Sequence, residues 1–299
     1  MNIISLLVWT LERNCFTVYT VLIVCFVGFT LLHKNKLETH YRAVAKKEKL
    51  ARNNITRKER DNPDDSDGDP EMLVPAIPED TPHVAYNPPR RPDDEVLQRS
   101  REYYELMAQR RTVRDFSTEP IPQEVLDNLI KTAGTSPSGA HTEPWSFVVV
   151  QDPKTKEAIR EIVEEEEELN YNKRMSRQWV TDLKPFSTKP IKPYLTDAPA
   201  LVLVFRQTHS WRPDGKKRMH YYSEISTAIA AGFLLAAIQY CGLAALTSTP
   251  LHCGPRLRAL LRRPRHERLE LLLPVGRPGR AASVPLLARK PLHQIQINI

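Results

Sequence analysis

An uninterrupted apolar run near the amino terminus constrains this chain more than any other feature. Cys15 to Leu32 is 18 residues without a charge. As a helix at ~1.5 Å per residue the run would extend about 27 Å, close to the thickness of bilayer hydrocarbon. A cleaved signal peptide is the alternative, but it needs a shorter run and a small-residue cleavage site, whereas this run leads directly into His33-Lys34-Asn35-Lys36. The sequence therefore favours a retained single transmembrane helix at residues 15–32, within an anchor that covers residues 1–33.

Cationic residues are distributed unequally about this run. Arg13 is the one cation before it, whereas seven lysines and arginines follow within residues 34–52. The positive-inside rule then places the remainder of the chain in the cytosol. We therefore expect a single-pass protein of the plasma membrane or of an intracellular vesicle membrane.

Residues 34–92 have the composition of a flexible tether. A basic stretch leads into the acidic segment Asp61–Asp69 and then into a proline-rich stretch, with apolar residues too sparse for a packed core. The chain carries a formal charge of +7, but no zinc finger or RNA-recognition motif accompanies its basic blocks, so we expect no nucleic-acid partner. With 10 glycines it offers no GxGxxG or Walker loop, and its 4 cysteines lack metal-ligand spacing, so no metal site is expected.

Apolar periodicity predicts the folded region, residues 93–299. Helices are expected from Val96 to Arg111, from Pro122, from Pro153 through a glutamate run, and from Glu224 to Tyr240; strands are expected over 146–150, 200–205, 243–246 and 269–275. The uncharged part of the last helix is about 14 residues, which is short for a membrane span, so we expect a buried central helix. This order of elements predicts an α+β fold with a central sheet.

Two segments carry side chains suited to a phosphate or a flat ligand. Arg110-Arg111-Thr112-Val113-Arg114 places three guanidiniums at the expected end of a helix, where they could bind a phosphate or simply favour the helix dipole. In the loop Ser136–Trp145, Gly139 and Ala140 permit close backbone approach and Ser138 offers a hydroxyl. An ordinary tight connection is the alternative for this loop.

Two further segments carry hydroxyls and charges. Thr247-Ser248-Thr249-Pro250 follows a predicted strand, so its hydroxyls either face a site or belong to a strand edge. Glu164–Glu168 would normally form a solvated helix face, because adjacent carboxylates repel one another. Together with Tyr171 and Lys192, however, a carboxylate from this run complements an amino-acid zwitterion. The residues alone leave both interpretations open.

Taken together, these segments resemble the flavin-dependent nitroreductase superfamily, and within it the branch that dehalogenates iodotyrosines. The resemblance covers about residues 97–299 and extends to the N-terminal anchor. It continues through Trp179–Leu183, His220–Tyr222, Thr249–Leu251, Cys253–Leu257 and Arg289–Leu292. It implies a nitroreductase-like three-layer fold, with a central mixed or antiparallel sheet flanked by helices, in a domain-swapped homodimer.

The resemblance also implies an FMN site at the subunit interface, lined by both chains. The residues that it implies for FMN binding are Arg110, Arg111, Arg114, Ser138, Gly139, Thr247, Ser248, Thr249 and Arg289. Thr249 is the implied catalytic residue, which donates a hydrogen bond to the flavin N5. The residues implied for substrate binding are Ala140, Glu167, Tyr171 and Lys192.

The implied activity is FMN-dependent reductive dehalogenation of mono- and diiodotyrosine to tyrosine plus iodide, a form of iodide salvage. NADPH is the expected ultimate electron donor, with an electron-donating reductase as partner because the chain has no dinucleotide fingerprint. A broader FMN nitroreductase or quinone reductase is the alternative, and a non-catalytic flavin-binding protein is a third. The chain departs from the family pattern in three places. Ser248 stands where a threonine is usual, the expected lid carries Pro185, Pro190 and Pro193, and Arg262-Arg263-Pro264-Arg265 is more basic than usual and has no assigned role.

Overall fold

The computed structural model describes residues 75, 77–212 and 215–299, and the expected membrane anchor and most of the expected tether lie outside these residues. The helices are α2 (Asp93–Ala108), α3 (Gln123–Gly134), α4 (Pro153–Leu169), α5 (Arg177–Leu183), α6 (Tyr194–Asp197), α7 (Ser223–Tyr240) and α8 (Gly254–Leu260). The strands are β1 (Trp145–Val150), β2 (Ala200–Gln207), β3 (His209–Trp211), β4 (Lys217–Met219), β5 (Ala244–Ala245) and β6 (Glu267–Gly276). Short 3-10 or π turns are η2 (Gly139–His141), η3 (Asn170–Arg174), η4 (Lys184–Phe186) and η5 (Leu292–Gln294).

Four strands form the central sheet, in the order β1-β2-β6-β5, and each neighbouring pair is antiparallel. A single parallel bridge joins Thr112 to Ala245 at its edge, within the described residues. The expected mixed or antiparallel sheet is therefore an antiparallel one. Strands β3 and β4 form a separate hairpin that the sequence patterns did not reveal.

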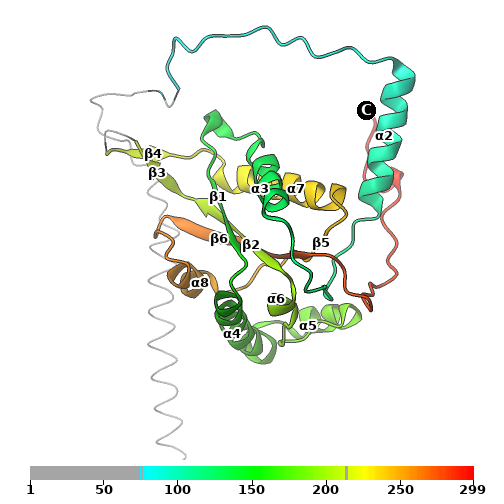
Figure 1. Cartoon of the computed structure of the whole chain (residues 1–299), viewed down its shortest axis with the longest axis vertical. Helices are drawn as coiled ribbons and strands as arrows, with labels where there is room; N and C mark the ends of the chain where they lie inside the picture. Colours follow the sequence, from blue (N-terminus) through cyan, green and yellow to red (C-terminus); the bar gives the residue numbers. More distant parts are fainter. Residues whose placement is uncertain (1–74, 76, 213–214) are drawn as a thin grey trace, which may run out of the picture. The chain divides into compact units, whose positions relative to one another are not determined.

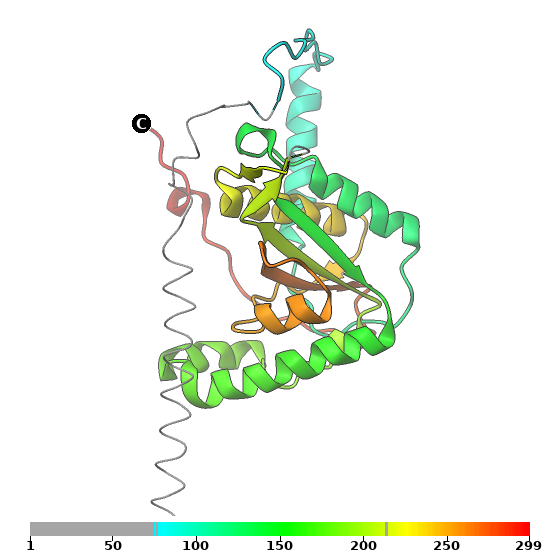
Figure 2. The same ribbon diagram turned by 90° about the vertical axis from the view of Figure 1, so that its left-hand side faces the viewer.

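Strand β2 is buried from Ala200 to Phe205 because β1 and β6 pair with its two edges and helices cover both faces of the sheet. Leu201, Leu203 and Phe205 point into one hydrophobic cluster, while the intervening residues point into a second cluster on the other face. Helices α3 and α7 cover the second cluster, and α4, α6 and α8 cover the first, so the predicted three-layer α+β arrangement is confirmed (Figure 1). Figure 2 shows the long helix α4, in green, running along the side of the sheet opposite α7.

Local sequence explains where the flanking helices begin. Asp152 caps α4, since its carboxylate accepts a hydrogen bond from the Thr155 N–H at 2.8 Å, and Pro153 fits the first turn without a donor. Pro122 precedes α3, which buries Leu126 and Leu129 against the sheet as its periodicity predicts.

Two expected helix faces are not covered in the single chain. Helix α2 ends at Ala108, before the arginines, and has no buried residue; Tyr103 and Tyr104 are exposed. Helix α7 packs one face on the core, with Leu234 and Ile238 buried, as expected of a central helix, but its other face exposes Ile225 and Phe233. Among the described residues α7 is the one helix long and apolar enough, by length and composition, to cross a membrane. Periodicity reveals an apolar face but not which molecule covers it.

One buried charge is anchored where β1, β2 and β6 meet. Glu267 is 1% exposed, and its carboxylate receives a bidentate contact from Arg263, with both distances 2.7 Å. Ser146 donates to the same carboxylate at 2.8 Å, and Gln207 donates to Ser146. Burial by itself raises the pKa of Glu267, but the hydrogen bonds from Arg263 and Ser146 lower it below its ordinary value. Arg263, in a basic stretch without an assigned role, is thus a structural partner.

Replacing Arg263 by alanine should destabilise the chain, because it leaves the Glu267 carboxylate buried without its cation. Losing one partner of a buried pair typically costs ~3–5 kcal/mol. Because the Arg263 side chain is 34% exposed and water can partly replace it, we expect a smaller loss of about 2–3 kcal/mol. Urea denaturation in detergent measures the change, and the exposed Arg265→Ala serves as control. Equal stabilities of the two variants would contradict this role.

Candidate functional site

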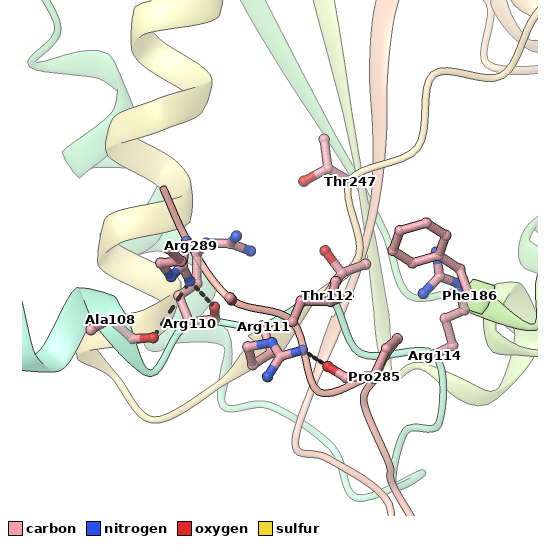
Figure 3. Close-up of a pocket in the computed structure, with 11 residues that line it drawn as sticks. Ala108, Arg110, Arg111, Thr112, Arg114, Phe186, Thr247, Pro285 and Arg289 are labelled. Carbon is pink, nitrogen blue, oxygen red and sulfur yellow. Dashed lines mark hydrogen bonds between the residues drawn. The ribbon is translucent and has the colours of Figure 1, made fainter. Parts of the chain in front are cut away.

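An arginine-lined cavity lies between the end of α2 and the C-terminal tail. It has a volume of about 410 Å³. Arg110, Arg111, Arg114 and Arg289 line it, together with Thr247 and part of the tail (Figure 3). The four predicted arginines thus meet at one cavity, although Arg289 is separated from the others by most of the folded region.

The tail is held at this cavity by backbone acceptors. Arg111 donates to the carbonyl of Pro285, and Arg289 donates to the carbonyl of Arg110 at 3.0 Å (Figure 3). Burial, followed by the positive charges of Arg289 and Arg111, lowers the pKa of Arg110. No acidic side chain lines the cavity in the described part of the chain. Guanidiniums crowded together without a carboxylate create a positive potential that suits a phosphate.

The predicted hydroxyl segment runs past this cavity from the end of β5. Backbone hydrogen bonds join Ser248 to Leu272 in both directions, at 3.1 and 2.9 Å. Thr247 and Thr249 on either side of Ser248 are exposed, and Thr247 lines the cavity. The segment is thus pinned at its middle residue, which leaves its threonines free to face a ligand.

The loop that carries Ser138 and Ala140 is strained and tightly packed. Three of its non-glycine residues, Ala140, His141 and Glu143, have positive φ of 46–50°. Such backbone is uncommon outside glycine and is frequent at functional sites. A Cβ at Gly139 would lie 2.7 Å from the Tyr221 carbonyl oxygen, so the close approach permitted by this glycine is made to the chain's own backbone.

Sheet register separates this loop from the arginine cavity within one chain. Thr112, in the arginine segment, bridges Ala245, which lies across β6 from Ala200 of β2. Trp145 follows the Ser138 loop directly and pairs with Arg206. From Ala200 to Arg206 the strand rises six residues at ~3.3 Å, or about 20 Å. The structure therefore brings the arginines together with Thr247, which Ser248 and Thr249 follow in the chain, but it does not bring Ser138, Gly139 and Ala140 to them.

Glu167, Tyr171 and Lys192 form a compact cluster on the α4 side of the sheet. Lys192 Nζ lies 3.0 Å from Glu167 Oε2, and the two side chains are 8% and 13% exposed. The same ammonium lies 5.5 Å from the centre of the Tyr171 ring, whose hydroxyl is hydrogen-bonded to Thr188. Three residues separated by up to 25 positions thus meet, as the zwitterion interpretation requires.

Most of the glutamate run is paired rather than solvated. Glu164 pairs with Arg160, Glu165 with Arg256, Glu166 with Arg174 and Glu167 with Lys192. These cations come from α4, η3, α8 and the segment before α6. The adjacent carboxylates therefore point to different partners. The interpretation of the run as a plain solvated helix face holds for the exposed Glu165 and Glu168 but not for the partly buried Glu164, Glu166 and Glu167.

The cluster and the arginine cavity are neighbours. The buried Tyr194 has a raised pKa because of burial; the positive charge of Arg114 opposes this effect, and the negative charge of Glu167 adds to it. Tyr194 therefore lies within electrostatic range of both groups. Phe186, on the connection between Tyr171 and Lys192, also lines the arginine cavity.

Sequence reasoning missed several residues that organise these groups. Thr188 contacts the Tyr171 hydroxyl, and Glu164 accepts a hydrogen bond from the backbone N–H of Lys192. Asn170, which is fully buried, contacts Glu167. No short motif identifies such partners, because the contacts join elements up to 28 positions apart.

Among the described residues, the arginine-lined cavity suits the phosphate of FMN, and the Glu167–Tyr171–Lys192 cluster beside it suits an amino acid. Four guanidiniums around a cavity can hold a phosphate, and a run of hydroxyls leads away from them. The buried pair of opposite charges offers one partner for an ammonium and one for a carboxylate.

Comparisons with known proteins agree with this geometry. A family model described as "Nitroreductase family" matches residues 107–277. Iodotyrosine deiodinase 1 of Rattus norvegicus is 58% identical over 217 residues, which are 73% of this chain and 76% of that protein. Iodotyrosine deiodinase 1 of Homo sapiens is 57% identical over 221 residues, 74% of this chain and 76% of that protein. Iodotyrosine deiodinase of Hydra vulgaris is 56% identical over 215 residues, 72% and 79% respectively.

Solved structures give the same result. A crystal structure of oxidized iodotyrosine deiodinase bound to FMN and 3-iodo-L-tyrosine matches with a TM-score of 0.57 and 33% identity, covering 64% of this chain and 96% of that one. A BluB-like flavoprotein from Clostridium difficile shares the fold, with a TM-score of 0.52 at 21% identity over 66% of this chain and 98% of that one. The chain therefore belongs to the nitroreductase family and, within that family, to the iodotyrosine deiodinases.

Proposed function

We propose that this chain catalyses the FMN-dependent reductive dehalogenation of iodotyrosines to tyrosine and iodide. The observation that carries the proposal is the buried Glu167–Lys192 pair beside Tyr171, next to the arginine-lined cavity. An uncharged nitroaromatic or quinone has no use for such a pair, whereas an amino acid presents both complementary charges. Relatives at 57–58% identity that are named iodotyrosine deiodinase support the same activity.

In this proposal the arginine cavity holds the FMN phosphate. Arg110, Arg111, Arg114 and Arg289 bind its oxygens, and Thr247, Ser248 and Thr249 follow the flavin. When bound, FMN supplies the electrons that the reaction consumes. Thr249 donates a hydrogen bond toward the flavin N5, and this contact makes it the catalytic residue of the proposal.

The chain's own residues orient the substrate. Glu167 accepts hydrogen bonds from the ammonium of the amino acid, while Tyr171 and Lys192 donate to its carboxylate. The Glu167–Lys192 contact of the ligand-free chain then opens to admit the zwitterion between its partners. The connection that carries Phe186 closes over the site and excludes water. The reduction breaks the carbon–iodine bond, forms a carbon–hydrogen bond, takes up two electrons and one proton, and releases iodide.

A homodimer completes the site in this proposal. Ser138 and Gly139 of the partner subunit reach the flavin, and Ala140 of the partner subunit offers its backbone N–H to the substrate phenolate. Two observations support a second chain. The Ser138 loop lies about 20 Å along the sheet from the arginine cavity of its own chain, and α7 leaves an apolar face exposed.

The C-terminal tail fits a domain-swapped arrangement. Ile295, Ile297 and Ile299 are exposed at 67%, 88% and 121% of their reference areas. A second cavity, which is apolar and has a volume of about 410 Å³, lies between α2, α3 and α7 and includes Tyr103 and Phe233. Exposed apolar side chains and an open apolar cavity are stabilised when a second copy covers them. We therefore propose that the tail packs across the partner.

Two further features belong to the proposal. Residues 15–32 anchor the protein as a single-pass membrane helix with the catalytic domain in the cytosol. NADPH is the ultimate electron donor, and a partner reductase relays the electrons. The charge distribution about the apolar run supports the orientation of the anchor. The absence of a dinucleotide fingerprint from the sequence supports the relay through a partner reductase.

The purified full chain in detergent should contain FMN, and diiodotyrosine should quench its fluorescence saturably. Glu167→Gln should raise the Kd for diiodotyrosine about 10- to 100-fold, since a hydrogen bond to a charged group contributes ~1.5–3 kcal/mol. Turnover of an uncharged quinone should change less than about twofold, because that substrate makes no use of the carboxylate.

Glu168→Gln is the matched control, because this neighbouring carboxylate is exposed. Equal effects of Glu167→Gln on diiodotyrosine and on the quinone would favour the broader reductase. A chain that holds no flavin at all would overturn the proposed function.

Thr249→Ala should lower dehalogenation about 10- to 100-fold, because the contact toward the flavin N5 is lost. FMN content and the Kd for diiodotyrosine should stay close to those of the wild type, since other residues hold both ligands. Thr249→Ser keeps the hydroxyl and should retain most of the activity. Full activity of the alanine variant in a steady-state assay would show that Thr249 has no such role.

Phe233→Arg should convert the dimer into a monomer and release FMN, because it buries a charge in the middle of the proposed apolar interface. Sedimentation and flavin absorbance measure the two effects together. Leu260→Arg, on helix α8, places the same charge at another exposed apolar position and should leave both unchanged. A monomeric variant with full FMN content would contradict the shared site.

A further inference from the structure

Asn170 is a fully buried polar residue at the point where helix α4 becomes the π turn η3. Its side-chain amide nitrogen donates to Glu167 Oε1 at 3.3 Å and faces the Leu251 carbonyl at 3.5 Å. Its amide oxygen accepts from Arg174 at 3.1 Å. Buried asparagines are uncommon, and here both ends of the amide have partners.

The chemistry of these partners fixes the orientation of the amide. The nitrogen faces two acceptors and the oxygen faces a guanidinium donor, so the flipped amide would oppose like groups at every contact. The amide donor is therefore directed at Glu167 whenever this site is formed.

This contact settles which carboxylate of the glutamate run enters the site. Asn170 holds one oxygen of Glu167, and the other oxygen lies 3.0 Å from Lys192. The neighbouring Glu166 is paired instead with Arg174, at 2.6 Å. Asn170 and Arg174, both from the π turn, thus separate two adjacent acids. π turns within helices are frequently found at functional sites.

The Leu251 contact reaches the flavin side of the proposed site. Leu251 is two residues beyond Thr249, in the segment that Ser248 pins to β6. One side chain therefore touches both the carboxylate proposed to bind the substrate ammonium and the segment proposed to contact the flavin.

We infer that Asn170 is a positioning residue that fixes the Glu167 carboxylate relative to the Thr249 segment. This inference rests on the proposed function. The ammonium of the halotyrosine is held by Glu167, so Asn170 determines where the aromatic ring of the substrate lies with respect to the flavin. Asn170 itself contacts neither ligand and acts through Glu167.

Asn170→Asp in the full-length holoenzyme tests the inference, because aspartate has the same shape. It keeps the acceptor for Arg174 but replaces the donor to Glu167 and Leu251 by a second acceptor. We expect the Kd for diiodotyrosine to rise at least about tenfold. FMN content and turnover of an uncharged quinone should stay within about twofold of the wild type, because neither uses Glu167. Asn172→Asp, an exposed residue of the same turn, is the matched control.

A double-mutant cycle separates a positioning role from a merely structural one. If Asn170 acts through Glu167, then Asn170→Asp should change the Kd less than about twofold in a Glu167→Gln background. Additive effects of the two substitutions, or a loss of quinone turnover equal to the loss of diiodotyrosine binding, would overturn the inference.

Asn170→Ser provides a second variant if the aspartate variant does not fold. Serine is neutral and smaller, and a water molecule can occupy the space that it leaves. The same weakening of diiodotyrosine binding with retained FMN is expected, and unchanged binding in either variant overturns the inference. A wild-type chain without FMN or dehalogenation would instead refute the proposed function, so the two failures are distinguishable.

Discussion

The burial of strand β2 on both faces is the constraint on which the other elements depend. Its residues from Ala200 to Phe205 are at most 1% exposed, and they alternate between two hydrophobic clusters. A strand in this position needs a partner on each edge and helices on each face. β1 and β6 provide the edges, α3 and α7 cover one face, and α4, α6 and α8 cover the other. The arginine segment, the hydroxyl segment and the Ser138 loop each join this sheet at a definite register, which gives each of them a definite place.

The same register explains why the arginine segment and the Ser138 loop lie apart within one chain. The arginine segment joins the sheet beside Ala245, whereas the Ser138 loop leads into the opposite end of β1. The apolar face of α7 and the unburied helix α2 leave surface that a second copy would cover. The shared flavin site that we propose and the exposed apolar face of α7 would therefore both follow from one architecture.

Ion pairs organise the α4 side of the sheet and the end of the sheet where Glu267 is buried. Consecutive glutamates reach four different cations, because a helix directs neighbouring side chains to different sides. Glu167 is the member directed to Lys192, and Asn170 keeps it there. At the corner of the sheet Arg263 neutralises the buried Glu267. The basic stretch from Arg256 to Arg268 is thus partly structural, which its composition does not reveal.

The sequence by itself determined the order of the principal helices and strands, the α+β class, and the residue types of the candidate site. Periodicity and proline positions define α3, α4, β1, β2 and β6 closely, because these signals are local. The β3–β4 hairpin and the π turn were not predicted, because short elements carry weak sequence patterns. The exposure of one face of α7 was not predicted either, because an apolar helix face does not indicate which molecule covers it. Only the tertiary structure decided that Arg289 meets Arg110, that Glu167 rather than Glu166 meets Lys192, and that the Ser138 loop lies elsewhere. These contacts join residues distant in sequence, and the register of a sheet buried on both faces sets which of them meet.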